Sequence, residues 1–214
     1  VLSDRIGPWH DVAALEARGL RRSDSPIDQR VFKQRCAGFI SVGGAVRPQY
    51  ASMGLTLMND MTYPMHIKVV DQIMVLNSNT ATQALMHEQE VQRVHQLGKN
   101  VCENACKPEE EMSWCGDFDG TCPVCHGNLF TVDNGDETAT CAICGIKGTV
   151  SVANGKIHID FAKDELIHSR LTKEECAYHS REIMESFQAF APAASKAKEK
   201  AEKYRTYNVE VIKP

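Results

Sequence analysis

The chain has 214 residues, of which 43% are hydrophobic and 24% charged, which is ordinary for a globular protein of one or two domains. Its formal net charge of −4 argues against a general nucleic-acid-binding protein, whose domain is usually basic. No apolar run reaches the roughly 18 residues that a membrane helix needs. The nine cysteines, with no recognisable signal peptide before them, are expected to be reduced thiols. These features predict a cytoplasmic protein.

The first half of the chain alternates between predicted strands and helices. Residues 36–42 form a mostly apolar run before a glycine pair, which is typical of a strand buried on both faces of a parallel sheet. Residues 67–75 give a second strand, and helices are expected over residues 48–61 and 83–105. This alternation predicts parallel strands joined by right-handed crossovers. The apolar positions expected to share a helix face are Met53, Leu57, Met58 and Met61, and then Val91, Val94, Leu97 and Val101.

The second half of the chain differs from the first in its predicted secondary structure. Over residues 120–161, short strands alternate with turns, and the pairs Asn134 with Gly135 and Asn154 with Gly155 are strong hairpin signals. This stretch therefore predicts a small antiparallel module rather than a continuation of the parallel sheet.

The C-terminal region is predicted to be helical. Residues 171–191 are expected to form a helix that Pro192 ends or kinks. Its apolar side consists of Ile183, Met184, Phe187 and Phe190. Residues 193–203, rich in Ala, Lys and Glu, predict a solvated helix, with partner binding as the alternative.

Four cysteines have the spacing of metal ligands. Cys122, Cys125, Cys141 and Cys144 follow the pattern C-x2-C-x15-C-x2-C, which resembles a zinc ribbon. Four thiolates make a closed tetrahedral site, so we expect structural rather than catalytic zinc. A glycine after each C-x2-C pair is expected to relieve crowding, and His126 is expected beside the site or at the surface. The alternatives are unmetallated buried thiols and a rubredoxin-like iron site, which is disfavoured because no aromatic residue lies near the first pair.

Other cysteines are less informative. Cys102 and Cys106 share a predicted helix face and Cys115 follows in a loop. Together they could form a second metal site, although ordinary thiols are the favoured interpretation. Cys176 with His179 could form a nucleophile–base pair, which is disfavoured because nothing nearby supplies an oxyanion site.

A glycine loop follows the first predicted strand. In open α/β sheets, ligands bind beyond the carboxyl ends of the strands. Gly43, Gly44 and Ala45 occupy such a position, where missing side chains let the backbone approach a flat ligand. A simple turn is the alternative.

Several segments together resemble the second half of flavodoxin-like NAD(P)H-dependent FMN reductases, a group that includes iron–sulfur flavoproteins. The residues concerned are Leu2, Asp4, Arg5, Phe32, Lys33, Ile40, Ser41, Val42, Gly43, Gly44, Ala45, Met53, Gly54, Leu55, Val69, Val70, Asp71 and Gln72. The resemblance implies that Gly43, Gly44 and Ala45 lie against the flavin, with Arg47 and Tyr50 at the rim of the cofactor. Tyr50 would stack on a ring or pack against the following helix. No catalytic residue is assigned.

The resemblance also defines what is missing. The family's first strand and phosphate-binding loop have no counterpart in this sequence. We therefore expect a partial flavodoxin-like parallel sheet, consisting of the last two strands and their helices. Residues 1–106 would be the carboxyl-terminal part of a flavodoxin-like domain, residues 117–162 a zinc-ribbon module and residues 163–214 a helical tail. The chain would be a fragment of a longer protein or a subunit completed by a second chain, and a homo-oligomer is expected.

The function implied by the resemblance is FMN-dependent NAD(P)H oxidoreduction, with hydride passing from the nicotinamide to bound flavin and on to an acceptor. One alternative is a non-enzymatic zinc-ribbon adaptor or assembly subunit, and another is unusual flavin chemistry on a specific organic substrate. Acidic residues around the ribbon argue against nucleic acid as the partner. These residues are Asp117, Asp119, Asp133, Asp136 and Glu137.

Overall fold

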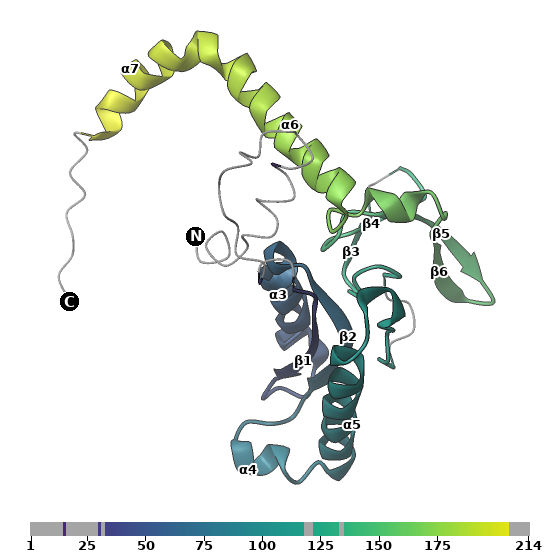
Figure 1. Ribbon diagram of the computed structural model, residues 1–214. Coiled ribbons are helices and arrows are strands. Elements are labelled where there is room, and N and C mark those ends of the chain that lie inside the picture. The colour runs from purple at the N-terminus through teal and green to yellow at the C-terminus, as the bar shows by residue number, and fades with distance from the viewer. Residues whose placement is uncertain (1–14, 16–29, 31–32, 118–121, 133–134, 206–214) are drawn as a thin grey trace, which may run out of the picture.

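The computed structural model describes residues 15, 30, 33–117, 122–132 and 135–205. Figure 1 shows a two-stranded parallel sheet, a four-stranded antiparallel sheet and the helices around them, so the predicted α/β class is confirmed. Several residues used above lie outside the described residues. These are Leu2, Asp4, Arg5, Phe32, Asp119, Asp133 and Asn134.

Two parallel strands form the centre of the first region. Strand β1 (Arg35–Val42) pairs in parallel with β2 (Ile67–Val75), with one register shift between Ala37 and Gly38. Both strand predictions are confirmed. Because the strands are parallel, their carboxyl ends meet at one edge, where the N–H of Gly43 donates to the carbonyl of Val75 at 2.8 Å.

Helices cover the two faces of this sheet. Leu55 of α3 (Met53–Thr62) packs with Phe39 and Val69 in one core cluster. On the opposite face, α5 (Glu88–Ala105) approaches β1 at Gly38, where an added Cβ would lie 2.6 Å from the Leu97 side chain. Gly38 is therefore needed for this close helix–strand packing.

The first helix differs from its prediction. Residues 48–61 divide into a 3-10 turn (Pro48–Tyr50) and α3. The face of α3 that is buried consists of Leu55, Thr56 and Asn59, whereas Met53, Leu57 and Met61 are exposed. Helical spacing identified residues that share a face, but it could not say which face meets the sheet.

The second helix also begins later than expected. Residues 83–105 contain the end of a short helix, α4 (Ala81–Ala84), and then α5. Thr80 begins α4 as its N-cap, since its side chain accepts a hydrogen bond from the N–H of Gln83 at 3.1 Å.

Strand β1 is not buried on both faces, contrary to the prediction. The side chains of Ile40 and Val42 are 41% and 56% exposed. Both residues lie on the face of the sheet that α5 approaches closely at Gly38. Beyond Gly38, nothing in the described part of the chain covers them, and they line an open groove.

The second sheet has the antiparallel order β3 (Phe130–Val132), β4 (Thr138–Cys141), β5 (Lys147–Ala153), β6 (Lys156–Asp160). Asn154 and Gly155 turn the β5–β6 hairpin with φ of 53° and 72°, as that pair predicts. The core of this module consists of the four cysteines with Ile143 and Ile146.

The C-terminal part is helical, as expected. Thr172 caps α6 (Lys173–Phe190), and a 3-10 turn (Ala191–Ala193) containing Pro192 separates it from α7 (Ala194–Arg205). The predicted interruption at Pro192 is thus confirmed. No helix among the described residues is long and apolar enough to cross a membrane.

Backbone contacts join the two sheets. The Cys115 N–H donates to the Val70 carbonyl at 2.8 Å. The Gln72 amide Nε2 donates to the His126 carbonyl at 2.6 Å. The cysteine module therefore lies directly beside β2.

Candidate functional site

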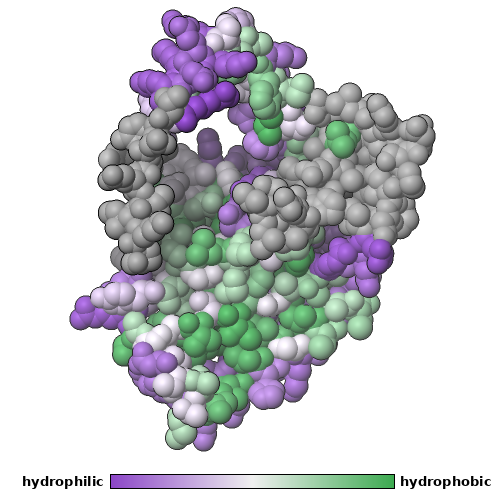
Figure 2. Space-filling model, turned by 90° about the vertical axis from the view of Figure 1, so that its left-hand side faces the viewer, coloured by the Kyte–Doolittle hydropathy of each residue, from purple (hydrophilic) through white to green (hydrophobic). Residues whose placement is uncertain are grey.

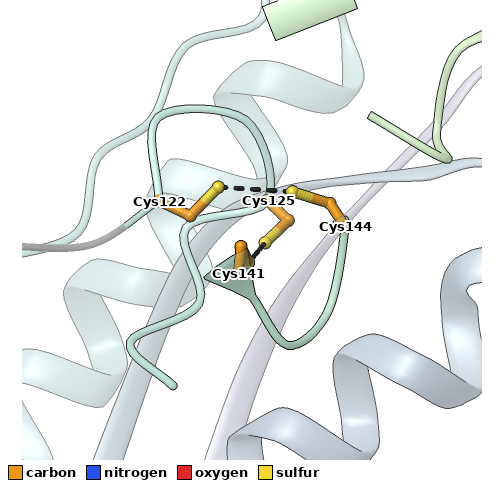
Figure 3. Close-up of side chains that lie close together, drawn as sticks. All are labelled: Cys122, Cys125, Cys141 and Cys144. Atoms are coloured by element: carbon orange, nitrogen blue, oxygen red, sulfur yellow. Dashed lines mark hydrogen bonds between the residues drawn. The ribbon is translucent and has the colours of Figure 1, made fainter. Parts of the chain in front are cut away.

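The four cysteines predicted as ligands converge on one point (Figure 3). Cys122 and Cys125 come from the loop before β3, whereas Cys141 ends β4 and Cys144 lies in the turn that follows. All four are buried, and their sulfur atoms lie within 4.8 Å of one another. Tetrahedral ligands at zinc–sulfur distances of about 2.3 Å are about 3.8 Å apart, so this group could hold a metal ion.

Both C-x2-C pairs form the same tight turn. The N–H of His126 donates to the Cys122 carbonyl at 2.9 Å, and the N–H of Gly145 donates to the Cys141 carbonyl at 3.0 Å. Each donor residue has a positive φ, 58° at His126 and 84° at Gly145. In the first turn the left-handed residue is His126, and the following Gly127 relieves crowding as expected, because an added Cβ there would lie 2.4 Å from the Ile143 side chain. Gly127 also donates its N–H to the Cys125 sulfur at 3.4 Å.

The four sulfur atoms are close enough to hydrogen-bond to one another. The Cys122 and Cys144 sulfurs are 3.4 Å apart, and those of Cys125 and Cys141 are 3.5 Å apart. Hydrogen bonding among the four thiols lowers the pKa of Cys141 and Cys144 and raises the pKa of Cys122 and Cys125. Thiolate is the form in which cysteine binds a metal ion.

His126 lies beside the cluster. Its ring stacks on Trp114 with centroids 4.1 Å apart, and burial, aided by the Lys68 charge, lowers the pKa of its imidazole to about 4. The aromatic residues Phe130 and Phe161 pack against the cysteine cluster, so the argument against iron from missing aromatic cover is wrong.

The glycine loop lies at the carboxyl edge of the parallel sheet, where the resemblance put it. The Ser78 N–H donates to the Gly43 carbonyl at 3.1 Å, and the Asn77 N–H donates to the Ala45 carbonyl at 3.0 Å. An added Cβ at Gly44 would lie 2.3 Å from Asn79 Oδ1. The close approach of the two loops that follow β1 and β2 is thus one reason for glycine at this position.

The remaining predicted flavin residues face solvent. Arg47 and Tyr50 are both exposed, and the Tyr50 side chain is 75% accessible. Tyr50 therefore does not pack against the following helix, which was one of its two expected positions. The amides of Gly44 and Ala45 have no hydrogen-bond acceptor in the described part of the chain. Flavin binding by these residues stays a prediction.

A buried charged group that the sequence analysis missed lies on β2. Asp71 is fully buried and accepts hydrogen bonds from Arg93 Nη1 at 2.9 Å and from Asn100 Nδ2 at 2.7 Å. Arg93 also pairs with the exposed Asp117. Its hydrogen bond to Asp71 raises the pKa of the Arg93 guanidinium, so Arg93 stays charged. The available signal was Asp71 and Gln72 together inside an otherwise apolar strand.

The other cysteines do not form the sites considered for them. In the described ranges, the only cluster able to hold a metal is the group of four. Cys102 and Cys106 are exposed, and Cys115 contacts Asn104.

Cys176 is buried, and its sulfur lies 3.9 Å from His66 Nε2. His179, the base considered for it, pairs instead with Glu182. Burial raises the pKa of Cys176 to about 11, which suits a core thiol rather than a nucleophile.

An open apolar groove of about 410 Å³ runs between the sheet and α5. Figure 2 shows hydrophobic side chains gathered over the lower part of the molecule, where β1, α3 and α4 lie. The apolar residues lining the groove include Ile40, Val42, Val75, Leu85, Val91 and Val94. This is the incomplete surface that a two-stranded sheet was expected to leave.

Comparisons with known proteins give two similarities. The chain is 29% identical over 160 residues to a flavone synthase of Aspergillus candidus, a match covering 74% of this chain and 49% of that protein. A solved structure named flavone reductase has a TM-score of 0.77 and 25% identity, and the match covers 99% of this chain and 72% of the other. No family model matches. Both names support an oxidoreductase-type function.

The chain spans about half the length of the curated relative. The part that matches includes both sheets in the solved structure, since 99% of this chain is covered. The similarity to the solved structure therefore concerns the whole described architecture, whereas the similarity to the flavone synthase covers 74% of this chain. Part of each relative lies outside the match.

Proposed function

We propose that the chain is the carboxyl-terminal part of a flavodoxin-like, FMN-dependent NAD(P)H oxidoreductase whose acceptor is a flavone-type ketone. The observation that carries this proposal is the similarity to two flavone-named enzymes, one of which follows 99% of this chain. The position of the glycine loop at the carboxyl edge of parallel strands supports it, since this is where α/β sheets bind ligands. Reduced thiols suit a cytoplasmic location.

The chain's own contribution to a flavin site would come from the loop after β1. The backbone amides of Gly44 and Ala45 could donate to the cofactor, Arg47 could neutralise negative charge, and Tyr50 could stack on a ring. When bound, FMN supplies hydride transfer between NAD(P)H and an acceptor. The phosphate cradle is expected outside this chain, so these residues would form only one side of the site.

A flavone contains a carbon–carbon double bond conjugated to a ketone. Its reduction adds one hydride and one proton across that bond, and NAD(P)H is oxidised to NAD(P)⁺. A synthase and a reductase of flavones name opposite directions of such a redox change, so one scaffold can serve either direction according to the available donor or acceptor.

The four-cysteine module is assigned structural zinc. All four sulfurs are protein ligands, which leaves no open position for a substrate. Its role would be to fold the module against β2, where Gln72 and Cys115 make the joining hydrogen bonds.

The apolar groove and the free edge of β1 are assigned to the rest of the flavodoxin-like domain, in the same polypeptide or in a second chain. If this surface instead holds a non-catalytic partner, the chain is an assembly subunit. Cys122→Ser tests the same question for the cysteine module: loss of oligomerisation with flavin reduction intact would make the module an assembly element.

The test uses the polypeptide that also contains the segment its relatives have outside the match. With NAD(P)H and a flavone under anaerobic conditions, we expect loss of flavone absorbance and a product heavier by two hydrogens. Tyr50→Ala should weaken FMN binding by about tenfold, the value of one aromatic stacking contact. Tyr178→Ala, which removes another exposed tyrosine, is the matched control. Unchanged flavone with reduced nicotinamide present would contradict the proposed substrate.

A further inference from the structure

The C-terminal helices form an arm without a core of their own. In Figure 1, α6 leads away from the cysteine module and α7 continues past the bend. Every residue over 181–205 is exposed except Ala197. The exposed residues include Phe187 at 65% and Phe190 at 50%. An isolated helix in water is marginal, so a long exposed helix with large apolar side chains calls for a packing partner.

A set of apolar residues of the arm forms one seam. Starting from Ile183, they recur at alternating steps of four and three residues across both helices. This is the spacing of the a and d positions of a coiled coil. The seam consists of Ile183, Phe187, Phe190, Ala194, Ala197, Ala201 and Tyr204.

The bend between the helices does not break the seam. Phe190, Ala191 and Ala194 keep right-handed helical dihedral angles on both sides of Pro192. In the same heptad numbering, Pro192 falls on the outer side of the helix, away from the seam. The missing N–H of Pro192 therefore bends the arm without turning the apolar residues to a different face.

Along the seam, side-chain size changes at the bend. The residues before Pro192 are large, whereas Ala194, Ala197 and Ala201 are small. Two parallel arms in register would place large residues against large and small against small. Two antiparallel arms related by a two-fold axis at Pro192 would instead place each of the large residues Ile183, Phe187 and Phe190 against an alanine.

We propose that two copies of this chain associate through their arms as an antiparallel two-stranded coiled coil centred on Pro192. The layers of this dimer follow directly from the register. Ile183 faces Ala201 of the second copy, Phe187 faces Ala197, and Phe190 faces Ala194. Each layer occurs twice because the interface is two-fold symmetric, and alternating large and small residues fill such layers without voids.

The charge distribution favours the same orientation. In this register α7 of one copy faces residues 179–190 of α6, which contain two glutamates and one arginine, whereas α7 contains five basic residues and two glutamates. Antiparallel arms place the acidic α6 beside the basic α7 of the second copy, and parallel arms would place like charges together. The arm thus supplies both the apolar seam and the charge complement for a second copy of itself.

The experiment is sedimentation equilibrium of the full chain and of variants that change the two layers formed by Phe187 and Ala197. The unmodified chain should be a reversible dimer. Phe187→Ala leaves a hole in two layers, and Ala197→Phe overfills the same two layers, so each should raise the dimer dissociation constant by at least about tenfold. The double variant rebuilds a large–small pair in each layer and should return to within about threefold of the original value.

Gln188→Ala is the matched control, because Gln188 is exposed on α6 outside the seam and its loss should leave the dimer unchanged. Far-UV circular dichroism of every variant checks that the helices persist. A monomeric unmodified chain would overturn the proposal, as would a dimer indifferent to both single changes. A double variant as weak as the two single changes combined would also overturn it, because that result requires a different register or an occupant within the same chain.

Discussion

The two sheets of this molecule are stabilised in different ways. The antiparallel sheet closes around four cysteines that lie within a short stretch of chain, and its core is made of those sulfurs with Ile143 and Ile146. The parallel pair has α3 and α5 on its faces, yet it leaves a groove of about 410 Å³ with an almost wholly apolar set of wall residues. The antiparallel sheet thus closes on a core of its own, whereas the parallel sheet leaves apolar side chains exposed.

This difference concerns the range of the contacts as well as their chemistry. A metal ion stabilises a small module through ligands close in sequence, so the module needs little apolar burial. A parallel sheet depends on contacts between distant segments and on cover over both faces. Changes in the two regions should therefore have different consequences, from metal loss at one extreme to nearly silent substitutions at the other.

The largest effect is expected at the cysteine cluster. Structural zinc contributes roughly 10–16 kcal/mol of apparent binding free energy in small zinc domains. Cys141→Ser should remove most of that contribution and unfold the antiparallel module. Metal analysis should fall from one zinc per chain to near zero, and protease should cut between residues 122 and 162 first. The control is Cys102→Ser at an exposed thiol, and equal zinc loss in both variants would contradict the assignment of the ligands.

The next largest effect is expected inside the parallel pair. Arg93→Met leaves the buried Asp71 carboxylate without its guanidinium partner, and such a loss costs about 3–5 kcal/mol. Urea unfolding should show this decrease in the free energy of unfolding. Asp117→Asn removes only the exposed partner of Arg93 and should cost less than about 1 kcal/mol. Similar decreases in the free energy of unfolding for the two variants would show that the ion pair with Asp71 does not stabilise the fold more than the pair with Asp117.

The thiols should differ in reactivity with pH. Because burial raises the pKa of Cys176 to about 11, roughly one Cys176 in a thousand would be thiolate at pH 8. Iodoacetamide should label the exposed Cys102 and Cys106 first, as read by peptide mass spectrometry. The Cys176 rate should rise about tenfold for each pH unit up to its pKa. Rapid labelling of Cys176 at neutral pH would revive the nucleophile hypothesis.

The smallest effect on the chain itself is expected in the apolar groove. Val42 is 56% exposed, so Val42→Thr should change the free energy of unfolding of the chain by less than about 0.5 kcal/mol. The same change should weaken association with the proposed rest of the flavodoxin-like domain by about tenfold. Val152→Thr, at an exposed valine of β5, is the control in the antiparallel sheet. It should change neither the free energy of unfolding nor the association. If Val42→Thr had no effect on association, the groove would have another role.

The sequence predicted what local chemistry determines. The parallel strands, the Asn154 and Gly155 hairpin, the interruption at Pro192 and the four converging cysteines all follow from spacing or turn chemistry. It could not predict that Leu55 rather than Leu57 faces the sheet, because the orientation of a helix depends on tertiary packing. The Asp71–Arg93 pair was missed for the same reason, since partners 22 residues apart meet only after folding.

The candidate flavin site was predicted less completely than the metal site. The position of Gly44 at the sheet edge follows from the strand and the glycine pair, but the approach of Asn79 does not. A four-cysteine site is local in sequence. A flavin site of the proposed kind combines loops from several strands, and the described part of this chain has two parallel strands.

The most direct test of the account is the cofactor content of the polypeptide that includes the segment found in the relatives. After desalting, flavin absorbance and metal analysis should give one FMN and one zinc per chain. A colourless protein that takes up no added FMN would contradict the proposed oxidoreductase, even if its zinc content were complete.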